Sequence, residues 1–235
     1  MEKIYRFMQL VMISLLVSCT SVPNTAEITR LGVLSITSDR ALVGVRSGER
    51  YIKGYPVDIS TWKINDVLTA EVVDRVSKIE WVDLREELGH KIDVPKDRYV
   101  RAANYREEIE QIQKKYALDG ILVLSNRVTS RDELAQYREY GYMPDKEVFK
   151  CAPHTFATVS IQYWHLGEEG LDDFRRTTLH KTCVEEEIQT KPSYTDRDLL
   201  PVRQRIEQDG VLALREALDH FFPGQLVKST MHSMK

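Results

Sequence analysis

Two cysteines and two histidines stand at mirrored spacing in the second half of the chain and could do chemistry together. Cys151 and His154 are three residues apart, and His180 and Cys183 repeat that spacing in reverse order. Two Cys and two His are a common ligand set for a structural zinc ion. A hairpin centred on Gly167 would pair cysteine with cysteine and histidine with histidine, although the alternation of apolar residues does not fix this register.

Strand geometry argues against a metal site made by all four side chains. Residues three apart in a strand point to opposite faces, so the four could converge only around a bulge. The metal site therefore remains an alternative, beside a disulfide and free thiols.

Other residues with catalytic potential lack the surroundings that catalysis needs. Ser35, Ser38 and Asp39 follow an apolar run, a usual place for sites in α/β proteins, but no Gly-x-Ser-x-Gly elbow surrounds them. The chain has neither a Walker loop nor a Gly-x-Gly-x-x-Gly motif. The sequence thus identifies no catalytic residue and gives no support for a cofactor.

The segment 126–150 is polar and charged, and its scattered aromatic residues include Tyr137, Tyr140 and Tyr142. Connections of this length are usually functional or disordered. Aromatic side chains supply contact area at a low cost in entropy, so we predict that the three tyrosines contact a protein or glycan partner. The alternative is that they fold back onto the domain's own sheet.

The first residues have the features of an export signal. Lys3 and Arg6 form a short positive region, and residues 10–17 are uncharged and almost wholly apolar. This run is too short to cross a bilayer as a helix but suits a signal peptide. The residues from Leu16 to Cys19, which read LVSC, resemble the lipobox of bacterial lipoproteins.

The resemblance implies that residues 1–18 are removed and that Cys19 carries diacylglycerol and an acylated amino terminus. Several acyl chains make a stable anchor on a membrane. Thr20 stands where inner-membrane lipoproteins of Gram-negative bacteria tend to have Asp, so we expect the outer membrane, with the protein on its periplasmic face. Residues 19–28 are expected to form a short polar tether between the lipid and the domain.

Export to an oxidising compartment favours the disulfide over the metal site. With Cys19 bound to lipid, Cys151 and Cys183 remain as an even pair where disulfides form and persist. Closing the loop of about thirty residues between them would stabilise the fold by roughly 3 kcal/mol on the chain-entropy model.

The balance of charges makes nucleic acid an unlikely partner. Residues 1–18 hold two of the 33 basic and one of the 36 acidic residues, so the mature chain has 31 basic and 35 acidic residues and a formal charge of −4. The charges are interspersed and form no basic tract. No second long apolar run follows the leader.

Apolar periodicity predicts one α/β (α+β) domain over residues 29–225, with an insertion at about 126–150 and a loose tail at 226–235. The expected sheet is mixed, with about three helices packed on it and one late β-hairpin. Strands are expected at 30–36, 40–46, 79–84 and 121–125, with a weaker one at 49–53 and the hairpin at 155–165 and 171–185. The short apolar run ILVLS at 121–125 is expected to be a central strand covered on both faces. Helices are expected at 62–78, 105–117 and 201–222.

This order of elements, on a chain with a lipobox, resembles the small α/β domains of periplasmic assembly factors such as the N-terminal domain of TolB and the penicillin-binding-protein activator LpoB. The resemblance lies in topology and setting, without a shared motif, and implies a binding module. We therefore expect a lipid-anchored, non-enzymatic binding or accessory protein of the cell envelope. The alternative is a metal-dependent or hydrolytic envelope enzyme that uses the region of Cys151, His154, His180 and Cys183.

Overall fold

A computed structural model of the chain describes residues 28–47, 51–92, 100–125, 140–144, 153–167, 170–189 and 191–222. The leader, Cys19, Tyr137, Cys151 and the tail lie outside these residues, so the expectations about them stay predictions. In the described part, no helix is both long and apolar enough to cross a membrane.

One mixed sheet of eight strands forms the centre of the domain. The strands, in chain order, are β1 (Arg30–Ser35), β2 (Arg40–Ser47), β3 (Tyr51–Asp58), β4 (Glu80–Asp83), β5 (Gly120–Ser125), β6 (Tyr140–Met143), β7 (His154–Gly167) and β8 (Gly170–Cys183). β1 pairs in parallel with β4 and β5, and β2 with β6, whereas the other pairs are antiparallel. The predicted mixed α/β fold with a late hairpin is confirmed.

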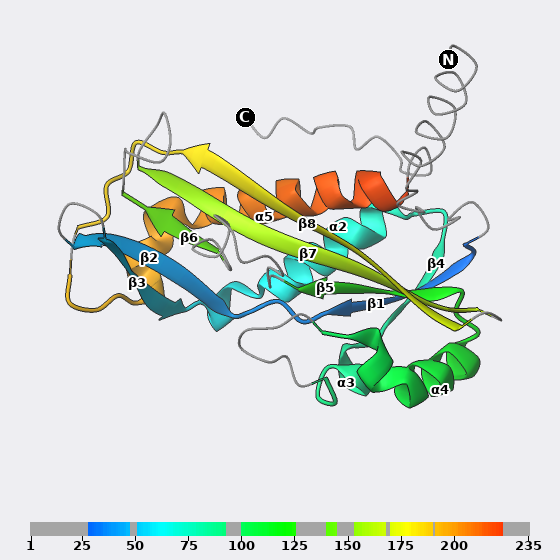
Figure 1. The fold of residues 1–235 in the computed structure, drawn as a ribbon. Coiled ribbons are helices and arrows are strands. Elements are labelled where there is room, and N and C mark those ends of the chain that lie inside the picture. Colours follow the sequence, from blue (N-terminus) through cyan, green and yellow to red (C-terminus); the bar gives the residue numbers. More distant parts are fainter. Residues whose placement is uncertain are drawn as a thin grey trace, which may run out of the picture.

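Strand β7 is the long axis on which the sheet is assembled. Along one edge it pairs first with β6, at residues 154–157, and then with β5, at residues 160–164. Its other edge pairs with β8 over the whole hairpin. The sheet thus has two ends, with β2, β3 and β6 at one and β4 and the first residues of β1 at the other (Figure 1).

Helices cover both faces of the sheet (Figure 1). Helices α2 (Ile64–Arg75) and α5 (Leu200–Phe221) pack on one face, and α3 (Arg85–Leu88) and α4 (Arg106–Tyr116) pack on the other. Short 3-10 turns lead into three of them, at Ser60–Trp62, Ala102–Tyr105 and Asp196–Leu199.

The alternation of side chains in β5 shows why the sheet needs both layers of helices. Leu122 and Leu124 belong to the core beneath α2 and α5, whereas Ile121 and Val123 belong to the core beneath α3 and α4. All four side chains are fully buried. A short, continuously apolar strand is typical of a sheet covered on both faces, as the sequence predicted for this segment.

The hairpin has a different register from the one that would pair the cysteines. The turn lies between Gly167 and Gly170, which form the last pair of the ladder. His154 therefore faces Cys183, and Ala157 faces His180. The symmetric pairing of cysteine with cysteine and histidine with histidine is wrong by three residues, because the hairpin is centred beyond Gly167 rather than on it.

The predicted insertion at 126–150 is in part a strand of the sheet. β6 lies between β2 and β7, with Tyr140, Gly141 and Tyr142 paired to both neighbours. A side chain on Gly141 would meet the carbonyl oxygen of Leu42 at 2.2 Å, so only glycine fits this close approach.

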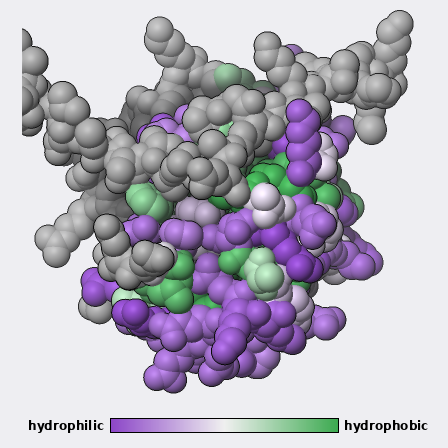
Figure 2. Space-filling view, turned by 90° about the vertical axis from the view of Figure 1, so that its right-hand side faces the viewer, coloured by the Kyte–Doolittle hydropathy of each residue, from purple (hydrophilic) through white to green (hydrophobic). Residues whose placement is uncertain are grey.

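At the end of the domain where β1 begins, the surface is mixed in hydropathy. Figure 2 looks onto this end and shows patches of hydrophobic residues between hydrophilic ones. Ile28, Ile79 and Val82 lie here and are partly buried. We call this the tether end, because the predicted tether at 19–28 leads into it.

Candidate functional site

The described residues of the alternative metal set, His154, His180 and Cys183, are divided between the two faces of the hairpin. His180 points toward α5, where its Nδ1 donates to the Oδ1 of Asp209 at 2.9 Å. Cys183 lies three residues further along β8 and so belongs to the opposite face, together with His154, its cross-strand partner. Because His154 and His180 lie on opposite faces, the four residues cannot all bind one ion, and the structure contradicts this alternative.

No other metal centre takes its place among the described residues, where no three or more His, Cys, Asp or Glu are arranged to hold an ion. Cys183 is the cysteine of the predicted pair that the structure describes. Its expected partner, Cys151, lies outside the described residues. The pairing of these two cysteines therefore stays a prediction.

A largely buried group of polar side chains surrounds Asp209, near the middle of α5. Its carboxylate is fully buried and accepts three hydrogen bonds from the hairpin. Thr155 Oγ1 donates at 2.6 Å, Thr182 Oγ1 at 2.5 Å and His180 Nδ1 at 2.9 Å. We call Asp209, Thr155, His180 and Thr182 the Asp209 cluster.

The positions of the four residues follow from the elements that carry them. Thr155 and Thr182 are a cross-strand pair, and His180 is two residues from Thr182 on the same face of β8. Asp209 faces them from α5, one turn after Ile206, which is also buried. An isolated buried carboxylate would be costly, and the three donors offset that cost.

The geometry of the Asp209 cluster is that of a junction between α5 and the hairpin rather than a hydrolytic triad. In a triad the nucleophile donates to the histidine, and the acid only orients the ring. Here both threonine hydroxyls donate to the carboxylate instead. Asp209 therefore orients the ring of His180, but neither threonine hydroxyl of the cluster donates to that ring as a nucleophile would.

The end of β1 also holds polar residues that a hydrolase could use, but they are engaged with each other. The hydroxyl of Ser35 donates to Oδ1 of Asn65 at 2.7 Å. The backbone N–H and the hydroxyl of Thr37 donate to the same oxygen at 2.9 Å. These bonds fix the link from β1 to β2 against the start of α2, so the described polar groups of Ser35 and Thr37 hold the local structure together.

Asp39, in the same link, has an altered acidity without a catalytic neighbour. Partial burial of the carboxyl raises its pKa, although the residue is largely exposed, and the negative charge of Asp58 raises it further. Asp58 itself has a pKa below its usual range, because the backbone and side chain of Ser60 donate to it. At the surface of the β2–β3 hairpin, the pKa of Asp39 is thus raised and the pKa of Asp58 is lowered, so Asp39 takes up a proton more readily than Asp58.

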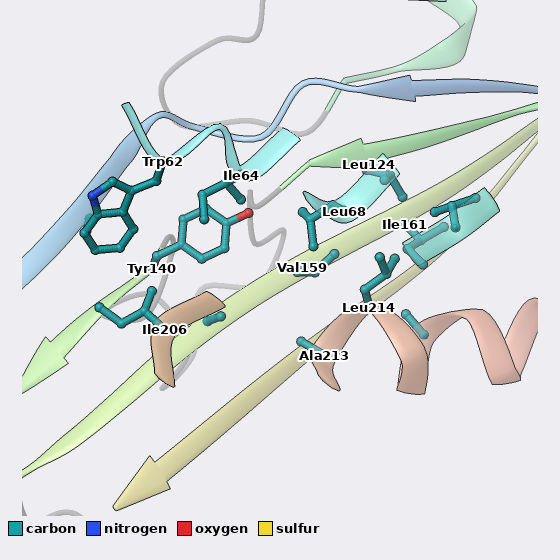
Figure 3. Packing of buried hydrophobic residues seen from close by; sticks show 14 of the residues in the cluster. Trp62, Ile64, Leu68, Leu124, Tyr140, Val159, Ile161, Ile206, Ala213 and Leu214 are labelled. Atoms are coloured by element: carbon teal, nitrogen blue, oxygen red, sulfur yellow. The ribbon is translucent and has the colours of Figure 1, made fainter. Parts of the chain in front are cut away.

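Tyr140 and Tyr142 are core residues, and their predicted role as an exposed contact surface is wrong. Both are buried in the layer between the sheet and helices α2 and α5. In Figure 3 the ring of Tyr140 lies among Ile64, Leu68 and Ile206. Tyr137 lies outside the described residues, so its predicted contact with a partner stays a prediction.

Small neighbours explain why the tyrosine rings turn inward. Tyr140 is paired with Ala41 on one side and Ala157 on the other. Gly210 of α5 faces it as well, since a side chain there would come within 3.4 Å of the ring. Tyr142 keeps its hydroxyl satisfied by accepting from the N–H of Ile188 at 3.2 Å, and burial raises the pKa of this phenol.

A second aspartate organises the tether end. Asp119 Oδ2 accepts from the N–H of Thr29 at 2.7 Å, from the hydroxyl of Thr29 at 2.9 Å and from the N–H of Arg30 at 2.8 Å. Its backbone carbonyl accepts from Nδ1 of His165 at 2.7 Å and from the hydroxyl of Tyr163 at 3.3 Å. Asp119 thus fixes the first residues of the domain to the centre of the sheet.

These bonds also set the acidity of Asp119. Burial alone would raise the pKa of the carboxyl, but the donors on Thr29 and Arg30 outweigh it, helped by the nearby His165. The net effect lowers the pKa of Asp119 below its ordinary value of 3.8. The carboxylate is therefore ionised and bonded throughout the neutral range.

Comparison with known proteins does not assign the chain to a family. No family model matches it, and no curated protein matches it. Among solved structures, the hypothetical protein CT253 from Chlamydia trachomatis is similar with a TM-score of 0.42 and 9% sequence identity, over 81% of this chain and 98% of that one. An uncharacterized protein is similar with a TM-score of 0.32 and 11% identity, over 80% and 89% of the two chains.

Proposed function

We propose that the protein is a lipid-anchored accessory protein of the cell envelope, held on the periplasmic face of the outer membrane and acting by binding a protein or glycan partner. The observation that carries the proposal is the leader that ends in a lipobox at Cys19. The folded part adds support, because Asp119 fixes Thr29 and Arg30, among the first described residues, at one end of the sheet.

The tether limits how far the domain can stand from the membrane. Nine residues lead from Cys19 to Ile28, the first described residue. An extended chain spans at most about 3.3–3.6 Å per residue, so the tether reaches roughly 30 Å. The point where the tether enters the domain therefore stays within about 30 Å of the bilayer, and β2, β3 and β6 lie at the end of the sheet away from that point.

Cellular fractionation tests the anchor. The wild-type chain and a Cys19→Ala variant are produced in a Gram-negative host, and membranes and periplasm are separated. The proposal predicts that the wild type sediments with outer membranes, whereas the variant is uncleaved or soluble. A Cys19→Ala variant that still fractionates fully with outer membranes after cleavage of its leader would contradict it.

The partner is proposed to bind at the end away from the tether. Ser193 is exposed at that end, next to Tyr194, whose ring meets the ring of Tyr55 in β3 at 5.6 Å between centroids. Lys78 is exposed at the tether end. A photo-crosslinking residue at position 193 should capture an envelope component that the same residue at position 78 does not. Equal capture from both positions, or from neither, would contradict this placement.

An enzymatic function is less well supported by the geometry. Its metal-dependent form needs His154 and His180 on one face, and the hairpin places them on opposite faces. Its hydrolytic form needs a nucleophile on His180, and the hydroxyls beside this ring donate to Asp209. We therefore propose binding rather than catalysis.

A further inference from the structure

Trp81 is an exposed tryptophan on the outer strand of the tether end. Its relative exposure is 41%, and only it and Leu200, at 54%, are exposed large hydrophobic residues among those described. The other two tryptophans, Trp62 and Trp164, are buried. Trp81 lies on β4, which in the described sheet pairs with β1 alone. Nothing in the fold of the described residues explains why an indole ring is left in solvent here.

The position of Trp81 relative to the tether is fixed by the strand register. Trp81 faces Leu31 across the β1–β4 pair, and Glu80 faces Arg30. Leu31 is three residues from Ile28, so the indole lies on the order of 10 Å from the point where the tether enters the sheet. The same short tether that holds the domain near the bilayer thus holds Trp81 near it.

The chemistry around Trp81 suits the boundary between headgroups and acyl chains. An indole has an apolar body and a polar N–H, and tryptophan is enriched at membrane interfaces. Ile28 and Ile79 extend the apolar surface beside it, and both are partly buried against the core. Lys78 is exposed next to them and can approach lipid phosphates.

We infer that Trp81 inserts into the interfacial layer of the membrane to which Cys19 is anchored, so that the domain rests on the bilayer with its tether end. This inference rests on the proposed lipid anchor and deepens it, because it assigns a second contact with the lipid surface. It also fixes an orientation, since a lipid chain alone would leave the domain free to turn about its tether.

Leu200 provides a matched control at the other end of the molecule. It begins α5, a helix of 22 residues and hence about 33 Å long. The last turn of α5 lies near the end of α2, where the guanidinium of Arg75 donates to Oδ1 of Asp219 at 2.5 Å. The first turns of α5 lie near the start of α2, where Arg203 lies over the ring of Trp62. Leu200 is therefore an exposed apolar side chain far from the tether.

Tryptophan fluorescence of the lipidated full-length protein in vesicles tests the inference, because Trp81 is the solvent-accessible indole. Vesicles are made of phosphatidylethanolamine and phosphatidylglycerol, with or without brominated acyl chains that quench at short range. We expect bromolipid quenching and a blue shift of the wild-type emission, loss of both in a Trp81→Phe variant, and retention of both in a Leu200→Ser variant.

Three other outcomes would overturn the inference, and the first two differ in what they say of the anchor. If mass spectrometry finds the acyl chains on Cys19 but Trp81 stays quenched by aqueous acrylamide and not by bromolipids, the anchor stands and the membrane contact is wrong. If Cys19 carries no acyl mass and the protein does not bind the vesicles, the anchor itself is wrong and the contact falls with it. Blue-shifted emission without bromolipid quenching would mean that protein, rather than lipid, covers Trp81.

Discussion

Two aspartates act on opposite ends of the same strand, and they differ in what they connect. Asp209 is fully buried and bonds to Thr155, near the start of β7. Asp119 is partly exposed, and its backbone carbonyl accepts a hydrogen bond from Nδ1 of His165, near the end of β7. The first joins a helix to a hairpin inside the domain, whereas the second fixes the place where the chain enters it.

The comparison shows where to look for function in this molecule. The polar residues at the Asp209 end satisfy one another in the interior, and the tyrosines beside them fill the core. At the tether end an apolar ring, Trp81, remains in solvent. Substitutions at the Asp209 end should therefore cost stability, and substitutions at the tether end should change contact with the membrane or the response to pH.

The largest loss is expected from the core tyrosines. Replacing Tyr140 by Ser removes a fully buried ring, which should lower the free energy of unfolding by about 3–5 kcal/mol. Denaturant titration measures the loss, with Leu200→Ser, at an exposed side chain, as the control that should change stability little. A Tyr140→Ser variant as stable as the control would contradict the burial of Tyr140 and would favour the exposed position that the sequence predicted.

Asp209→Ala should cost nearly as much, about 3 kcal/mol or more, because two threonine hydroxyls and His180 lose a buried acceptor together. His180→Ala removes one partly exposed donor and should cost about 1 kcal/mol. Thermal unfolding of the two variants at neutral pH compares them. Equal losses would show that the bond to His180, rather than the carboxylate, holds the junction together.

The predicted disulfide should contribute roughly 3 kcal/mol if Cys151 and Cys183 are joined. Non-reducing peptide mass spectrometry of protein from the periplasm identifies the linked peptides directly. Double replacement by Ser should lower the unfolding midpoint to that of the reduced wild type. Two freely alkylatable thiols in the periplasmic protein would contradict the pairing.

Asp119→Asn should have a smaller effect that depends on pH. Because the folded state lowers the pKa of Asp119, its bonds stabilise the protein above the ordinary value of 3.8, and this contribution is lost as pH falls through the lower folded pKa. We expect the variant to be less stable by about 1–2 kcal/mol at neutral pH, allowing for partial exposure of the carboxyl.

Unfolding curves from pH 7 to pH 3 measure this dependence. The gap between the wild type and Asp119→Asn should be constant down to about pH 5 and narrow below pH 3.8. A gap that widens as the pH falls would mean that the folded state raises the pKa of Asp119 instead.

Much of the sheet could be predicted, because runs of apolar residues in the sequence indicate its strands. The run ILVLS of β5 was identified as a doubly covered strand, and helices α2, α4 and α5 were placed from their apolar stripes. The sequence did not predict β6, because this strand is only four residues long and has a glycine where an apolar residue would indicate a strand. The spacing of Tyr140 and Tyr142, which puts both on one face, was the available signal.

The polar centres were harder to find, because each joins residues far apart in the sequence. Asp209 interrupts the apolar stripe of α5 after Ile206, and a charged residue at such a position indicates a buried partner. Its partners Thr155 and Thr182 come from both strands of a hairpin whose register only the structure supplies. Asp119 bonds to Thr29 from 90 residues away, and no local pattern marks that contact.

Mass spectrometry of the amino-terminal peptide of the mature protein, taken from native membranes, tests the proposed anchor most directly. The account predicts a peptide that begins at Cys19 and carries the mass of diacylglycerol and an additional acyl chain, and that loses this mass in the Cys19→Ala variant. An unmodified peptide that retains residues before Cys19, found in protein that is nonetheless bound to the membrane, would contradict it.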